Sequence, residues 1–77
     1  MKTIFAKLEA INYVGKQTNY WVTWLIKEAD KFYVGTDKSN LNHYKKILKG
    51  QVDKNYIEAL STIYKDQQEA FKSYDRL

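Results

Sequence analysis

Hydrophobic and polar residues alternate along the start of the chain. From residue 4 to residue 10 the even positions carry small or aliphatic side chains: Ile4, Ala6, Leu8 and Ala10. A period of two is typical of a β-strand, because successive side chains of a strand point to opposite faces. Residues 15–19 then include a glycine and an asparagine, which favour a turn. The pattern predicts a first strand that ends in a loop.

Two further strands are predicted before the middle of the chain. Residues 20–28 are rich in β-branched and aromatic side chains, and residues 32–36 form a shorter run of the same kind. A tight turn at residues 29–31 separates the two runs. Strands that follow one another closely usually pair. We therefore expect a three-stranded antiparallel meander over residues 3–36, with the short third strand at an edge that is open to strand addition by a partner or a second copy.

The second half of the chain changes to a helical period. Asp37 or Ser39 is placed to cap a helix over about residues 40–49, and Gly50 is placed to end it. A long helix over about residues 54–76 follows. Its apolar positions recur at spacings of three and four residues. They are Tyr56, Ile57, Leu60, Ile63, Tyr64, Ala70, Phe71, Tyr74 and Leu77. The prediction is a single α+β domain over residues 1–77, of order βββαα, with both helices packed on one sheet face.

The strand register decides which residues share a face. With a three-residue second turn, Glu28 pairs with Phe32. One face is then almost free of charge and is expected to be buried. It carries Ile4, Ala6, Leu8, Ala10, Tyr20, Val22, Trp24, Ile26, Phe32 and Val34. A two-residue turn would instead shift the register by one and exchange the residues of the third strand between the faces.

The opposite face has too many large apolar side chains for a face exposed to solvent. It mixes polar residues with six large ones, which together would exceed the roughly 300–600 Å² patch of an ordinary monomer. These six are Phe5, Ile11, Tyr13, Trp21, Leu25 and Tyr33. Aromatic residues are enriched at the centres of protein interfaces. The six are therefore the predicted protein-binding residues, with a second subunit or the long helix as the alternative cover.

Charge supports a second hypothesis. The net charge is +4, and residues 1–50 hold nine lysines against four acids. Lysines beside exposed aromatic rings can hold single-stranded nucleic acid. The candidate residues are Lys7, Lys27, Lys31, Lys38, Lys45, Lys46 and Lys49. Because Arg76 is the only arginine among the thirteen cations, such binding would carry little sequence specificity. Codon usage in an AT-rich genome is the alternative explanation for the lysine excess.

Catalytic and metal chemistry find little support in the sequence. Cysteine is absent and His43 is the only histidine, so thiolate and histidine-cluster metal sites are excluded. His43 is expected on the solvent side of the first helix. The three serines (Ser39, Ser61 and Ser73) lack a nucleophile-elbow context, and the glycines are too isolated for a phosphate-binding loop. The chain is predicted not to be an enzyme and to need no cofactor or metal.

The location predicted from the sequence is cytoplasmic. Lys7 and Glu9 interrupt the apolar run that a signal peptide would need. No apolar run reaches the roughly 18 residues needed to cross a bilayer, so no membrane partner is expected.

The general profile of a very small, basic α+β chain without a recognisable active site is similar to that of accessory proteins of phages and mobile elements. Many of these are stoichiometric inhibitors of host enzymes, including anti-CRISPR and anti-restriction proteins. The resemblance implies a small non-enzymatic protein that acts by binding another protein or by self-association. A nucleic-acid-binding module is the alternative.

Overall fold

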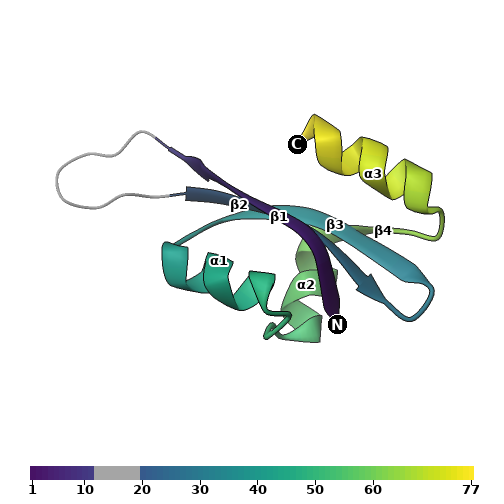
Figure 1. Cartoon of the computed structure of the whole chain (residues 1–77), viewed down its shortest axis with the longest axis horizontal. Helices are drawn as coiled ribbons and strands as arrows, with labels where there is room; N and C mark the ends of the chain where they lie inside the picture. The colour runs from purple at the N-terminus through teal and green to yellow at the C-terminus, as the bar shows by residue number, and fades with distance from the viewer. Residues whose placement is uncertain (12–19) are drawn as a thin grey trace, which may run out of the picture.

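The computed structural model describes residues 1–11 and 20–77 (Figure 1). In this part of the chain the fold is α+β, with four antiparallel strands and three helices, which confirms the predicted class. The elements are β1 (Lys2–Ala10), β2 (Tyr20–Glu28), β3 (Lys31–Ser39), α1 (Leu41–Leu48), α2 (Lys54–Leu60), β4 (Ser61–Tyr64) and α3 (Gln67–Arg76). The strands lie in the order β1-β2-β3-β4, so the predicted meander is extended by one strand.

The turn between β2 and β3 has two residues, so the expected pairing of Glu28 with Phe32 is wrong. Glu28 pairs with Lys31 instead. Ala29 adopts a positive φ of 55°, and a positive φ is what two-residue hairpin turns require. The shift places Tyr33 opposite Ile26 and moves the neighbouring residues of β3 to the other face. The register therefore follows the two-residue alternative.

One face of the sheet, called here the first face, is covered by α1 and α2. Its buried residues are Val22, Trp24, Ile26 and Tyr33 from the strands, with Ile47 from α1 and Ile57 from α2. Ala6 and Leu8 pack against this cluster, as expected from the period-two pattern. Apolar positions on both helices thus meet the uncharged side of β2.

The opposite face, called here the second face, is covered by α3, so the prediction that all helices lie on one face is wrong (Figure 1). Leu25, Phe32, Val34 and Ala70 are buried there. Ile4 packs against the same cluster because the register shifts between Thr3 and Phe5. The physical reason is that both faces carry large apolar side chains, and each therefore needs a cover.

The predicted long helix over residues 54–76 is also wrong, because β4 interrupts it. The segment Thr62-Ile63-Tyr64 consists of β-branched and aromatic residues, which favour a strand. Its pairing with β3 covers Phe32 to Gly35. A new helix then begins after its N-cap, Asp66, whose side chain accepts a hydrogen bond from the Gln68 amide at 3.0 Å. Since β4 pairs with β3, the predicted edge position of β3 is wrong, and β1 and β4 are the outer strands.

The ends of α1 are close to the prediction of a helix over residues 40–49. Its N-cap is Asn40, not Asp37 or Ser39, and the Asn40 side chain accepts a hydrogen bond from the His43 amide at 2.8 Å. Gly50 ends the helix with a φ of 72°. The Gln51 amide donates to the Lys46 carbonyl at 2.9 Å. This is the closing bond of a glycine-dependent helix end.

Candidate functional site

The second face is hollowed where α3 ends. A groove of about 220 Å³ lies there, formed by β1, β2, β3 and the residue that follows α3. We call it the Trp21 groove. It is lined by Glu9, Trp21, Thr23, Thr36 and Leu77. The strand register explains this grouping, because Glu9 pairs with Trp21 and Thr23 pairs with Thr36 across adjacent strands.

Trp21 forms an exposed aromatic wall of the groove. Its side chain is 39% exposed, whereas Trp24 on the same strand is fully buried. The Lys38 ammonium lies 5.4 Å from the centroid of the Trp21 ring. A cation at this distance over an indole is attracted to it and limits its motion. The groove therefore presents a large, oriented apolar surface beside a positive charge.

The floor of the groove is polar, but its hydroxyl groups are paired. The hydroxyl oxygens of Thr23 and Thr36 are 3.1 Å apart. The Thr36 hydroxyl also lies 3.1 Å from the Val22 carbonyl, to which it can donate. Polar groups that are already satisfied offer little to a charged ligand. The floor is thus better suited to apolar contact beside Leu77, which is exposed.

An aromatic cluster between β1 and α3 closes the second face beside the groove. The Phe5 ring lies 5.6 Å from Phe71 and 5.8 Å from Tyr74, measured between centroids. Lys7 extends over the Tyr74 ring at 4.8 Å and donates to the Tyr74 carbonyl at 3.3 Å. Burial raises the pKa of the Tyr74 hydroxyl. These contacts hold α3 against β1 and fix the boundary between the covered and open parts of the face.

The six residues predicted to bind protein do not form one surface. Trp21 lines the groove, and Phe5 is half exposed against α3. Leu25 is fully buried under α3, and Tyr33 is buried on the first face because of the register shift. Ile11 is half-buried just after β1. The sixth residue, Tyr13, lies outside the described residues.

The seven candidate lysines are divided between the two faces. On the second face, Lys7, Lys27 and Lys38 each lie over an aromatic ring of the protein itself, the ring under Lys27 being that of Phe32. The remaining four are exposed elsewhere. Lys31 begins β3, and Lys45, Lys46 and Lys49 belong to α1 and the residue after it. The structure therefore does not gather the seven lysines into one tract.

His43 belongs to a polar cluster where β3, α1 and α2 meet, and it is half-buried rather than on the solvent side of α1. Its Nδ1 atom lies 2.6 Å from the Ser39 hydroxyl oxygen, and its ring packs edge-on against Tyr56. The Tyr56 hydroxyl donates to Asp37 at 2.7 Å. The hydrogen bond of the imidazole Nδ1 atom is thus with Ser39, and the hydrogen bond to Asp37 comes from Tyr56. The cluster joins three elements of the fold.

Sequence reasoning missed Leu77 and Thr36 as groove residues. Leu77 was assigned to the apolar stripe of a long helix, and its place beside Trp21 depends on the break at β4. The pattern Asp66-Gln67-Gln68-Glu69 was an available signal for that break, because it has the spacing of a helix-starting capping box. Predicting Thr36 as a groove residue required the correct pairing register of β2 and β3.

Comparison with protein-family models, with curated proteins and with solved structures finds no match for this chain. In residues 1–11 and 20–77, no group of three histidine or acidic side chains is placed to hold a metal ion. None of the helices in this same part of the chain has the length and apolar character needed to cross a bilayer.

Proposed function

We propose that this protein acts by binding another protein through the Trp21 groove. The observation that carries the proposal is the exposure of Trp21 beside a hollow that α3 leaves open. Tryptophan is among the residues that contribute most to binding when a partner buries it. The ring is also oriented before binding by Lys38, which reduces the entropy lost on association.

The surroundings of the groove have the composition of an interface. Trp21 and Leu77 supply an apolar centre, while Glu9 and Lys38 place charges of both signs at its margin. Apolar centres with charged rims are typical of protein–protein contacts. A protein that occupies a partner's surface in this way can inhibit it without chemistry of its own. A stoichiometric inhibitor of the kind found among phage and mobile-element accessory proteins is the corresponding role.

Nucleic-acid binding is the second candidate, and the exposed lysines of α1 favour it. Lys45 and Lys46, with Lys49 at the helix end, are all exposed. The support is weaker because these lysines lie on the first-face side of the molecule, away from the exposed Trp21 ring. Lys38 lies beside Trp21, but stacking on Trp21 and phosphate contact by the lysines of α1 would require two separate surfaces.

The test is capture of partners from cells of the source organism with tagged wild-type protein, with and without nuclease. We expect a nuclease-resistant protein partner that Trp21→Ala loses, through a weakening of at least about 30-fold, as hot-spot tryptophans give. Leu48→Ala is the matched control, because Leu48 is a similarly exposed apolar residue on α1. A partner that nuclease removes, or one that both variants retain, would contradict the proposal.

A further inference from the structure

The outer strand β4 carries a second surface, and we infer that it pairs with β4 of a second copy of this chain in a symmetric dimer. Among the described residues, β4 is hydrogen-bonded on one side only, to β3. Half of the backbone groups of such a strand point away from its neighbour and are free to pair with another strand. Four residues, Ser61–Tyr64, form this edge.

Apolar side chains beside this edge are exposed on the first-face side. Ile63 is 47% exposed, and Leu60 at the end of α2 is 40% exposed. An exposed edge strand with uncovered apolar residues is a template for strand pairing, and proteins usually protect such an edge with charges or a cover. Pairing of two β4 strands about a two-fold axis would bring both Ile63 side chains together and remove them from water.

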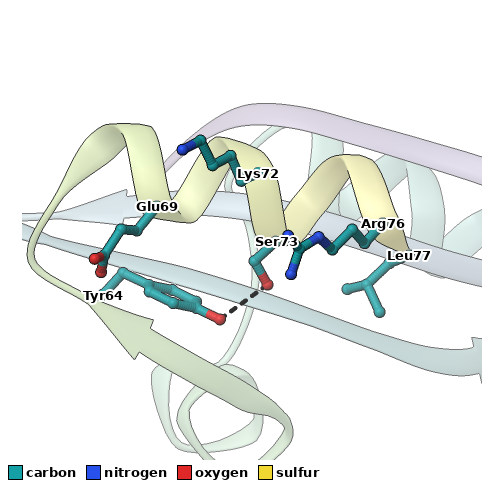
Figure 2. A pocket seen from close by; sticks show the side chains of 6 residues that line it. All are labelled: Tyr64, Glu69, Lys72, Ser73, Arg76 and Leu77. Carbon is teal, nitrogen blue, oxygen red and sulfur yellow. Dashed lines mark hydrogen bonds between the residues drawn. The ribbon is translucent and has the colours of Figure 1, made fainter.

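On the other side of β4, a hollow separates the strand from α3 (Figure 2). Its volume is about 320 Å³, and it is lined by Tyr64, Glu69, Lys72, Ser73, Arg76 and Leu77. The Tyr64 hydroxyl donates to Ser73 at 2.9 Å in the middle of the hollow. Figure 2 shows Glu69 at one end and Arg76 at the other. Lys72 also lines the hollow, between these two residues on α3, so the hollow has an acid at one end, a base at the other and a second base between them.

This polarity is complementary to itself under a two-fold rotation. The helix α3 runs back along β4 (Figure 1), so that Glu69 lies near Tyr64, the residue that ends β4, and Arg76 lies farther back along the strand (Figure 2). Seven helical residues and three strand residues each span about 10 Å. Antiparallel pairing of the two β4 strands therefore sets Glu69 of one copy opposite Arg76 of the other, twice. Within the described residues, neither side chain has an ion-pair partner in its own chain.

A second copy fits this surface better than an acidic or a basic peptide would. A peptide of one charge would satisfy one end of the hollow and be repelled at the other. A second copy satisfies both ends, continues the sheet across the axis and covers Ile63. The inference does not depend on the Trp21 groove, since none of the residues of β4 lines that groove and Leu77 is the one residue that the groove and the hollow have in common.

The experiment is sedimentation equilibrium of the full chain from roughly 1 μM to 1 mM, the range in which a small interface associates. We expect the mass to rise with concentration from 9.2 kDa to twice that value. Arg76→Glu and Glu69→Arg are each expected to weaken association at least about tenfold, because both cross-axis pairs become repulsive. Circular dichroism checks that each variant is folded.

An equimolar mixture of the two variants provides the decisive control. In a mixed dimer, the Arg76→Glu chain offers two acids and the Glu69→Arg chain offers two bases, so both cross-axis pairs are attractive again. We expect the dissociation constant of the mixture to lie within about threefold of the wild-type value. This corresponds to a free-energy difference smaller than the contribution of one exposed ion pair. Each chain in the mixture keeps its own substitution, so damage to α3 cannot explain a restored association.

Two further measurements complete the test. Amide hydrogen exchange of Ser61–Tyr64 is expected to slow as protein concentration rises, and Trp21→Ala is expected to associate as wild type does. A wild-type chain that stays monomeric at the highest concentration would overturn the inference. A mixture of the two variants that associates no more strongly than either variant alone would also overturn it. A dimer that dissociates when Trp21 is replaced by alanine would do the same. If the dimer is intact but no captured protein partner depends on Trp21, only the proposed function is contradicted.

Discussion

The two faces of the sheet are built from the same strands but are covered to different extents. On the first face, α1 and α2 bury Trp24 completely. On the second face, α3 buries Leu25, but Trp21 on the same strand remains 39% exposed. The comparison shows that the extent of the helical cover, and not the residue type, decides whether an aromatic side chain becomes core or surface.

The lengths of the elements account for the difference. The ten residues of α3 span about 15 Å, whereas the nine residues of β2 span about 30 Å. A single short helix therefore covers about half of the second face. The first face has two helices, α1 and α2, which follow each other along it. The open half of the second face contains the Trp21 groove.

The strongest way to break the comparison is to truncate each tryptophan in turn. Trp24→Ala is expected to lower the free energy of unfolding by about 3–5 kcal/mol, because it leaves a cavity in the core and removes the hydrogen bond to Ser61. Trp21→Ala is expected to cost less than about 1 kcal/mol, since the ring is partly exposed. Urea denaturation of the two variants measures both values. Equal losses would show that the two faces are equally part of the core.

A smaller effect is expected at Gly35, where the first face meets β4. A Cβ atom on Gly35 would lie within 3 Å of the Trp24 ring and would meet the Leu60 carbonyl. Gly35→Ala should therefore lower the free energy of unfolding by about 1–3 kcal/mol through overpacking. Lys31→Ala, an exposed substitution at the start of the same strand, is the control in the same denaturation experiment. A stabilised Gly35→Ala variant would contradict the close packing of Trp24 against β3 and β4.

The polar cluster beside the first face gives a pH-dependent prediction. Burial, the hydrogen bond to Asp37 and the Asp37 charge all raise the pKa of Tyr56 above its ordinary value. The neutral hydroxyl thus stabilises the fold fully below about pH 10, and this contribution falls as the pH rises further, because the unfolded chain then ionises more readily. Tyr56→Phe should cost about 1 kcal/mol at pH 7. The difference in free energy of unfolding between Tyr56→Phe and wild type, measured from denaturation curves, should become smaller above about pH 10. A difference that widens there would contradict the assigned hydrogen bond.

The smallest change sharpens the comparison without altering stability appreciably. Trp21→Phe leaves the buried Trp24 as the only indole, so acrylamide should quench the remaining fluorescence less than it quenches wild type. Trp24→Phe leaves the exposed indole and should give the opposite result. Quenching that is equal in both variants would mean that the second face is closed in solution.

The sequence predicted the parts of the fold that depend on a single local pattern. The prediction failed where the same residues fit both a helix and a strand. The alternation in β1 and the β-rich composition of β2 indicated strands correctly. Ile63 and Tyr64, however, lie at helical spacing from Ile57 and Leu60 while also being good strand formers. The strand forms by pairing with β3, where Gly35, far away in the sequence, has no Cβ to meet the Leu60 carbonyl.

The candidate site was predictable only in part for a similar reason. Trp21 and Trp24 are three residues apart on one strand, so one of them had to face away from the main core. The register of β3 depended on a turn with Ala29 at positive φ. Because glycine, asparagine and aspartate are the usual residues at such a position, an alanine there does not indicate this turn. Leu77 lies in the groove because α3 is a separate helix that begins after β4 and ends beside Trp21.

The packing of α3 against β1 has a consequence for synthesis on the ribosome. The contacts of Phe5 with Phe71 and Tyr74 join β1 to α3, which lie far apart in the sequence. Proteins are made from the N-terminus, so the meander emerges while α3 is still being translated. During that interval the nascent sheet presents Leu25 and Val34 to solvent or to chaperones, and these residues are buried only after α3 has been made.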